Sequence, residues 1–255
     1  MLLTLDIGNT NVTFGVFEGD ELRATWRVAT NVSQMADEYA ALLFNLLRHQ
    51  GLDTSDIKEV VLCCVVPPLL GTFAELFQRY FGLSPLVVGP GVKTGVRIRI
   101  DNPREAGTDR IVNTAAAHHL YSGAVIVVDL GTATTFDIVS REGDYVGGII
   151  ATGIATAAEA LFARANALPR VELVHPKQAI GTDTITAMQS GIVFGYVGLV
   201  EGLVVRVQRE LGEKATVVAT GGYAALIAKE TTVIDKINPD LTLIGLRLIY
   251  LMNTV

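Results

Sequence analysis

The stretch LTLDIGNTNVTFGVF, residues 3–17, places Asp6, two glycines and several short polar side chains inside an otherwise apolar run. The stretch AVIVVDLGTATTFDIV, residues 124–139, repeats the arrangement: an apolar run, Asp-X-Gly, a threonine-rich turn and a second apolar segment. Apolar alternation of this kind predicts half-buried strands. Each stretch therefore predicts two strands joined by a tight polar turn, and the recurrence indicates an internal duplication.

The composition favours a protein that acts on a small molecule. Half of the 255 residues are hydrophobic, which is enough for substantial cores. The net charge of -6 argues against nucleic-acid or anionic-membrane partners, because both bind clustered lysine and arginine. No uninterrupted apolar stretch reaches the roughly 18 residues of a membrane helix, and Asp6 and Asn9 fall too early for a secretory signal. We therefore expect a cytoplasmic location.

The order of predicted strands and helices repeats along the chain. Three strands open each half, at residues 2–7, 13–17 and 22–28 and again at 125–129, 135–140 and 145–150. In the first half a helix, a strand, a helix and a strand follow, at 35–50, 59–66, 69–81 and 85–88. In the second half a long helical region, a strand at 215–219, a helix after Gly222 and a last helix within 239–253 follow. This predicts an α/β fold of two βββαβα domains, at 1–117 and 118–255, with a cleft between them.

The two Asp-X-Gly turns have the chemistry of phosphate loops. Glycine at positions 8 and 131 allows the backbone to take a positive φ or to approach a ligand closely. Successive backbone N–H groups, with flanking threonine hydroxyls, suit phosphate oxygens. Asp6 and Asp129, each at the end of a predicted strand, suit a metal ion or its waters. Two such loops facing one cleft predict a site for ATP with Mg²⁺ in a chain without a Walker A motif.

A third segment fits the same kind of site. VVATGGYAALIAKE, residues 217–230, is a predicted buried strand that runs into Gly-Gly at the start of a helix. The missing side chains would let a flat ring or a phosphate lie against the backbone. The alternative is a simple strand-to-helix turn.

The only cysteines, Cys63 and Cys64, are neighbours in the apolar run KEVVLCCVVPPLL. Adjacent residues in a strand point to opposite faces, which excludes a disulfide between the two. We expect both thiols to serve buried packing.

With these motifs the chain resembles the superfamily of acetate and sugar kinases, Hsp70 and actin, which share duplicated ribonuclease-H-like units. Within it, the chain is similar to type III pantothenate kinases over nearly its whole length. The segments that carry this resemblance are DIGNT, DLGTATT, ATGGY, DNPREAGTDRIVNTAAA, GGII, EALFARANALPRVEL, AMQSGIVFGYVGLVEG and PDLTLIGLRLIY.

The resemblance implies an ATP-dependent, homodimeric enzyme that phosphorylates the primary hydroxyl of pantothenate to give 4'-phosphopantothenate, the first step of coenzyme A biosynthesis. It implies that Thr132 contacts ATP in the second loop and that Asp129 holds a potassium or ammonium ion, with Asp6 a candidate for Mg²⁺. The first ATP loop would comprise Asp6, Ile7, Gly8, Asn9, Thr10, Asn11, Val12 and Thr13.

By the same resemblance, Gly107, Thr108, Asp109 and Arg110 bind pantothenate, with Asp109 as the catalytic base. The GTDR segment precedes an alanine-rich helical pattern, and a helix N-terminus favours an anion such as the pantothenate carboxylate. The alternative is that Asp109 caps the helix and that Arg110 is surface charge.

Two further positions belong to the implied substrate site. Where the family pattern has Tyr-Asp-Asn-Pro, this chain has Ile100, so an aromatic hydroxyl is missing. Thr184 would reach a substrate bound mainly by the other subunit of the dimer. The segment 182–207, which contains Thr184, is apolar nearly all round a helical wheel. This favours a helix packed on its own sheet and on a second subunit. The alternative is a helix enclosed within its own chain.

Two other functions remain open from the sequence. One is a catalytically silent, nucleotide-binding regulatory or accessory protein of the same fold. The other is a kinase that acts on a different small hydroxylated acid, which the isoleucine at position 100 would favour.

Overall fold

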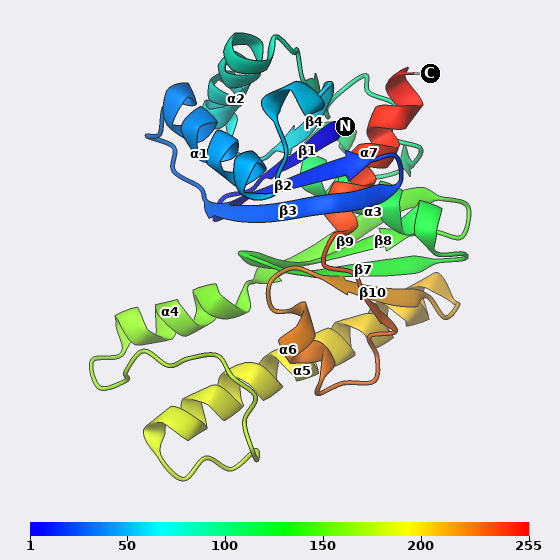
Figure 1. Ribbon diagram of the computed structural model, residues 1–255. Helices are drawn as coiled ribbons and strands as arrows, with labels where there is room; N and C mark the ends of the chain where they lie inside the picture. The colour runs from blue at the N-terminus through cyan, green and yellow to red at the C-terminus, as the bar shows by residue number, and fades with distance from the viewer. Residues whose placement is uncertain (255) are drawn as a thin grey trace. The chain divides into compact units, whose positions relative to one another are not determined.

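The computed structural model describes residues 1–254, which form two compact units (Figure 1). The first unit comprises residues 1–95, 102–116 and the segment from Thr242 onward; the second comprises 96–101 and 117–241. The C-terminal helix thus groups with the first unit, a point on which the sequence pattern is silent. The ranges 1–117 and 118–255 stay a prediction of the domain boundaries.

The first unit is built on a five-stranded sheet in the order β3-β2-β1-β4-β5. Antiparallel pairing joins β1 to β2 and β2 to β3, whereas β1–β4 and β4–β5 are parallel. The strands are β1 (Leu2–Ile7), β2 (Asn11–Glu18), β3 (Glu21–Ala29), β4 (Glu59–Cys64) and β5 (Leu86–Val87). Helices α1 (Ala36–His49) and α2 (Pro67–Phe81) alternate with the later strands, and a short 3-10 turn, η1, spans Thr54–Asp56.

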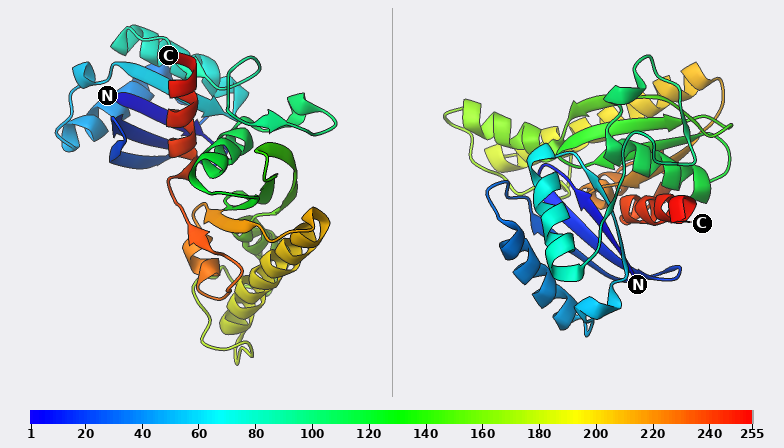
Figure 2. Two further views of the ribbon diagram at one scale, coloured as in Figure 1. Left: turned by 90° about the vertical axis from the view of Figure 1, so that its right-hand side faces the viewer. Right: turned by 90° about the horizontal axis from the view of Figure 1, so that it is seen from above.

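Helices cover both faces of this sheet. α1 and α2 pack on one face around a core that includes Leu3, Leu5, Phe14, Tyr39 and Phe73. On the other face lies α7 (Leu241–Thr254), where a Cβ at Gly15 would meet Leu243 Cδ1 at 2.9 Å. Figure 2 shows α7 on the opposite side of the sheet from α1 and α2. Helix α3 (Thr108–Leu120), which follows the turn η2 (Pro103–Glu105), contacts α7 where the Val112 carbonyl meets Gly245.

The second unit repeats this topology in a six-stranded sheet of order β11-β10-β7-β8-β9-β6. Its members are β6 (Arg97–Ile98), β7 (Val125–Leu130), β8 (Ala133–Val139), β9 (Asp144–Thr152), β10 (Thr216–Thr220) and β11 (Lys236–Ile237). Without β6, its strands lie across the sheet in the same order as those of the first unit: the third, second, first, fourth and fifth strand of the unit. The predicted duplication of an α/β unit is therefore confirmed.

Helices α4 (Ile154–Arg164), α5 (Thr184–Leu211) and α6 (Ala224–Ala228) lie on one side of this sheet (Figure 1). Their core partners include Ile126, Val128, Phe136, Val193 and Val200. Residues 165–183 form no helix, so the single long helical region expected after β9 is wrong and consists of two helices. The strands β6 and β11 were not predicted, because each has two residues and, unlike β5, lies in no continuous apolar run.

Within the described residues, α5 is the one helix long and apolar enough to cross a bilayer. It has 28 residues, and a third of its apolar window is buried in the protein. The core helix of a soluble protein can have the same length and composition, so these properties are weak evidence for a membrane-spanning helix. Counting uninterrupted apolar residues misses α5, since Gly191, Gly195, Gly198, Gly202 and Glu201 interrupt the run.

Candidate active site

The first predicted phosphate loop connects β1 to β2 at residues 8–10. The Gly8 N–H donates to the Asn11 carbonyl at 3.0 Å, which closes the turn. From the far end of β3, the Thr30 hydroxyl donates to the Gly8 carbonyl at 2.6 Å, and the Thr30 N–H donates to the Thr10 carbonyl at 2.9 Å. The side chains of Asn9 and Thr10 are exposed at the tip. The loop is thus held from behind by Thr30, which the sequence analysis did not single out.

The positive φ expected as one reason for glycine at positions 8 and 131 is wrong. Neither residue has a positive φ, and space is tight at Gly8 alone of the two. A Cβ at Gly8 would lie 3.1 Å from the Asn11 carbonyl that closes its own turn. A Cβ at Gly131 would lie 3.4 Å from Asp129 Oδ1. Close approach therefore explains Gly8, whereas a Cβ at Gly131 would make an ordinary van der Waals contact.

Strand register places four chemically active residues in one row across the first sheet. Asp6 pairs with Cys63 on β4 and with Thr13 on β2, and Thr13 pairs with Arg27 on β3. Paired positions point to the same face. The Cys63 thiol donates to Asp6 Oδ1 at 3.3 Å. The row puts Asp6 at the carboxyl end of β1 between a thiol and a hydroxyl.

The predicted substrate segment forms the first turn of α3, as expected. Ile111 N–H donates to the Gly107 carbonyl at 3.1 Å, and the Thr108 hydroxyl donates to the Cys64 carbonyl at 3.4 Å, which ties the helix start to the end of β4. Asp109 Oδ1 accepts from the Arg110 N–H at 2.9 Å. A Cβ at Gly107 would lie 2.6 Å from that same oxygen, so the carboxylate folds back over Gly107.

Asp6 and Asp109 are thereby brought together within the first unit. Burial raises the pKa of Asp6 to about 6, the Asp109 charge acts in the same direction, and the Cys63 hydrogen bond and Arg27 act against it. Burial also raises the pKa of Asp109, while the hydrogen bond and charge of Arg110 lower it. Two carboxylates that both disfavour ionisation form a site that a cation would stabilise. Strongly perturbed neighbouring acids are also typical of catalytic sites.

The second loop joins β7 to β8 in the second unit and has the same construction. The Gly131 N–H donates to the Ala133 carbonyl at 3.0 Å. The start of α4 lies against this loop: the Thr156 hydroxyl donates to the Thr132 carbonyl at 2.9 Å, and a Cβ at Gly153 would collide with the same oxygen. The Thr132 side chain is exposed, as a ligand contact requires.

The turn after β10 meets the second loop. Gly221 has a φ of +89°, and a Cβ there would lie 2.5 Å from Asp129 Oδ1 and 2.7 Å from the Leu130 carbonyl oxygen. The Tyr223 N–H donates to the same Leu130 carbonyl at 3.2 Å. Only glycine fits this position, and two oxygens converge on the space that a side chain would fill. Among the described residues, no three His, Cys, Asp or Glu side chains cluster as a transition-metal site would require.

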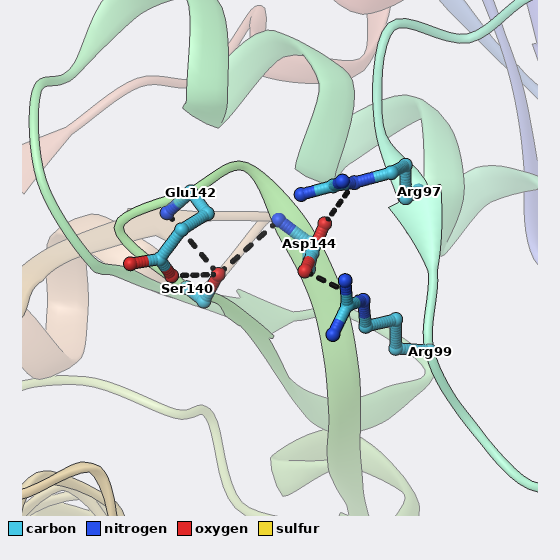
Figure 3. A network of polar contacts seen from close by, with 5 residues as sticks. All are labelled: Arg97, Arg99, Ser140, Glu142 and Asp144. Carbon is cyan, nitrogen blue, oxygen red and sulfur yellow. Dashed lines mark hydrogen bonds and ion pairs between the residues drawn. The ribbon is translucent and has the colours of Figure 1, made fainter.

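Ile100 lies elsewhere in the second unit, just beyond the edge strand β6. Figure 3 shows how this strand is held: Arg97 Nε and Arg99 Nε donate to the two oxygens of the buried Asp144, at 2.6 and 2.7 Å. The Ser140 hydroxyl in turn accepts from the Asp144 N–H at 3.3 Å. Two strands, β8 and β9, separate β6 from β7, so the second unit does not bring Ile100 beside Asp129.

Thr184 occupies the first turn of α5 and is exposed. The preceding Asp183 caps the helix by accepting from the Thr186 N–H at 2.9 Å. Thr184 borders an apolar hollow of about 540 Å³ whose other residues are Leu161, Leu168, Ala187, Met188, Gly191 and Ile192. Within the second unit, the neighbours of Thr184 are thus the apolar residues of this hollow.

Sequence reasoning missed two members of the site, Cys63 and Arg27. The cysteine was expected to serve packing alone, and the arginine was not singled out. The pairing of Asp6 with Cys63 depends on the register of β1 and β4, which are far apart along the chain. A polar side chain in a central apolar strand, opposite a strand that ends in aspartate, was the available signal.

The model of the type III pantothenate kinase family matches residues 2–206. A type III pantothenate kinase of Dehalococcoides mccartyi (strain CBDB1) is 57% identical over 254 residues, covering 100% of this chain and 97% of that protein. A type III pantothenate kinase of Moorella thermoacetica is 54% identical over 254 residues, covering 100% of this chain and 100% of that protein. The chain belongs to the type III pantothenate kinase family. The predicted family and the predicted class of enzyme, an ATP-dependent kinase, are confirmed.

Solved structures of distant sequence share the fold of this chain. The ethanolamine utilization protein EutJ from Carboxydothermus hydrogenoformans superposes with a TM-score of 0.53 at 14% identity, covering 97% of this chain and 89% of that one. Component A of (R)-2-hydroxyglutaryl-CoA dehydratase from Acidaminococcus fermentans gives 0.54 at 15% identity, covering 96% and 94%. These likenesses concern the fold alone, and the predicted duplicated fold of actin-like ATPases is confirmed.

Proposed function

We propose that this protein transfers the γ-phosphoryl group of ATP to the primary hydroxyl of pantothenate, giving 4'-phosphopantothenate, the first step of coenzyme A biosynthesis. The observation that carries the proposal is the approach of Asp6 and Asp109 in a chain that is 57% identical to a type III pantothenate kinase over its full length. We further propose that it acts in the cytoplasm, with no nucleic-acid or membrane partner.

Asp109 is proposed as the general base that accepts the hydroxyl proton of pantothenate. Its raised pKa moves a carboxylate toward the neutral range, where proton acceptance from an alcohol becomes more effective. The Arg110 hydrogen bond orients the carboxylate at the helix start. The positive end of the α3 dipole and the Arg110 guanidinium are suited to the pantothenate carboxylate.

The first loop is proposed to bind the phosphates of ATP through its backbone N–H groups and its threonine hydroxyls. Asp6 would hold Mg²⁺ directly or through water, because a divalent cation relieves the mutual repulsion of Asp6 and Asp109. When bound, Mg²⁺ neutralises charge on the phosphates. The residues of this chain supply the orientation: β1 and Thr30 fix the loop, and Cys63 contacts Asp6.

The second loop is proposed to contact ATP through Thr132 and to hold a potassium or ammonium ion at Asp129. Support comes from the convergence of Asp129 Oδ1 and the Leu130 carbonyl on the space at Gly221. Carboxylate and carbonyl oxygens are ligands for hard cations. The resemblance to the family gives the ion its identity.

We propose that the protein is a homodimer formed through α5. Four exposed glycines, Gly191, Gly195, Gly198 and Gly202, recur at spacings of four, three and four residues, and beyond the adjoining residues of α5 no described atom lies within 4 Å of a Cβ at any of them. At about 100° per residue they fall within about 60° of one another, opposite the buried face of α5. Each glycine costs about 1 kcal/mol in a helix interior, and close approach of a second helix would offset this cost.

The dimer would complete the substrate site. Thr184 and the apolar hollow beside it lie on the same helix as the glycine stripe. A two-fold axis along α5 would carry each Thr184 toward a pantothenate bound mainly by the other subunit. This role of Thr184 depends on the dimer.

Coupled measurement of ADP release with ATP, Mg²⁺ and potassium, with and without pantothenate, tests the function. ADP release that requires pantothenate is expected. No release with any acceptor would favour the silent regulatory protein. Release with another hydroxylated acid, and none with pantothenate, would favour a kinase of different specificity.

A further inference from the structure

Cys63 is the residue in the site for which neither the sequence pattern nor the family comparison supplies a role. Its side chain is fully buried, and its Sγ lies 3.3 Å from Asp6 Oδ1. Parallel pairing of β1 with β4 places the two residues side by side on one face of the sheet. Its neighbour Cys64 points to the other face, where the thiol donates to the Val66 carbonyl at 3.1 Å.

The Cys63 thiol is a hydrogen-bond donor. Its Sγ donates to Asp6 Oδ1 at 3.3 Å from a fully buried position on β4. An ionised carboxylate can only accept hydrogen bonds. The bond therefore runs from Cys63 to Asp6 and fixes the direction of one carboxylate oxygen.

Two charged side chains also act on Asp6. Asp109, on α3, opposes ionisation of Asp6, and Arg27, on β3, favours it. Cys64, on β4, is the other titratable group near the Cys63 thiol. Cys63 donates a hydrogen bond to the Asp6 carboxylate, so it acts on the direction of the carboxylate as well as on its charge.

We propose that Cys63 is a positioning residue for the kinase reaction, whose thiol fixes the Asp6 carboxylate in the orientation that binds Mg²⁺ together with ATP. The inference rests on the proposed function of Asp6. It assigns Cys63 no contact with substrate and no chemical step.

The first test compares Cys63→Ala, which removes the donor, with Cys63→Ser, which keeps one. Cys64→Ala is the matched control, since it deletes a thiol from the same strand without touching Asp6. Calorimetric titration with ATP at varied free Mg²⁺ gives a readout independent of turnover. In Cys63→Ala, the free Mg²⁺ needed for half-maximal ATP binding is expected to rise about fivefold, because a thiol is a weak donor and one hydrogen bond contributes about this factor. Cys63→Ser and Cys64→Ala should remain within about twofold of the wild type.

Kinetics should show the same selectivity. KM for ATP is expected to rise in Cys63→Ala while KM for pantothenate stays unchanged. Combination with Asp6→Asn provides the decisive cycle, because Cys63→Ala should have no further effect once Asp6 is replaced. Equal weakening by alanine and serine at position 63 would make Cys63 a packing residue and refute the proposal, as would wild-type Mg²⁺ dependence in Cys63→Ala.

A second test leaves position 63 intact. The chain has two cysteines, so Cys64→Ala leaves Cys63 as its sole thiol. The infrared S–H stretching band of this variant is expected to shift when Mg²⁺ and ATP are added and when Asp6→Asn is introduced. A band that moves in neither case contradicts the proposal. A wild type that binds ATP and fails to phosphorylate pantothenate would instead refute the proposed function and leave the Cys63 tests valid.

Discussion

Asp109, in the first turn of α3, lies close enough to Asp6, near the end of β1, to oppose the ionisation of the Asp6 carboxyl group. Burial is the larger cause, and together they raise the pKa of Asp6 to about 6 from its usual 3.8. A carboxyl group whose pKa is raised on folding binds more protons in the folded state. Stability is therefore lost as pH rises from about 4 to about 6, and the cost is fully present above that window.

The first prediction is that Asp6→Asn stabilises the protein without metal or nucleotide at neutral pH. With a chelator present, its free energy of unfolding should exceed that of the wild type by about 1–3 kcal/mol at pH 7 and by much less below about pH 4. Urea unfolding across this range measures the difference. Asp101→Asn removes an exposed carboxylate as the control. A difference that is constant with pH would argue against the shifted pKa.

The second prediction concerns the proposed base. Asp109→Asn keeps an oxygen that can accept from the Arg110 N–H but cannot accept the hydroxyl proton. Turnover should fall about 10²- to 10⁴-fold, the usual cost of losing a general base. ATP affinity by calorimetry should be retained, since the substitution also removes a charge that opposes ionisation of Asp6. Nearly normal turnover would leave Asp109 as a structural residue of the helix terminus.

The third prediction concerns the monovalent cation. Activity should depend on potassium or ammonium and fail with a bulky organic cation, because the space at Gly221 is bordered closely by Asp129 and Leu130. Asp129→Asn should weaken the response to potassium at unchanged unfolding temperature. Thr132→Ala, in the same loop, serves as the control that should alter ATP affinity and leave the potassium response intact. Full activity in potassium- and ammonium-free buffer would contradict the assignment.

Much of this fold could be predicted because the chemistry is local. Apolar runs interrupted by Asp-X-Gly define β1–β2 and β7–β8, and Leu2–Ile7 matches its expected strand at both ends. The GTDR segment begins α3 because its polar residues precede an alanine-rich pattern. In each case the residues that determine the element lie within it.

What could not be predicted depends on contacts between distant segments. The Cys63 thiol meets Asp6 through the register of β1 with β4. Helix α7 joins the first unit through Gly15 and Gly245, which have space for Leu243 and Val112 only because they lack side chains. The structural reason for Gly8 could not be predicted either. A Cβ there would approach the Asn11 carbonyl across the turn, a contact that the sequence pattern does not show.

The fourth prediction is that Ile100→Tyr lowers KM for pantothenate with little change in kcat. The half-buried Ile100 is held by the Arg97 and Arg99 ion pairs to Asp144, so a new side chain would start from a fixed backbone. It lies near Gly147, whose missing side chain leaves space beside it. One added hydrogen bond is worth about 1 kcal/mol, or about fivefold in KM. Ile100→Phe adds the ring without the hydroxyl and should leave KM unchanged; an equal gain in both variants would assign the effect to packing.

The last prediction tests the dimer through its glycine stripe. Gly195→Leu places a branched side chain at the centre of the stripe, where the single chain has space for it, so the fold should tolerate the change. Between two closely packed helices each copy would present the same leucine, and overpacking of this kind typically costs about 1–3 kcal/mol per site. Light scattering should therefore show a dimer for the wild type and a dissociation constant raised at least about tenfold for the variant.

Lys214→Leu adds the same side chain at an exposed position outside α5 and should remain dimeric. Activity should fall with dissociation and recover at high protein concentration, because Thr184 is proposed to act across the interface. A wild-type monomer with full activity would exclude both the dimer and the role of Thr184.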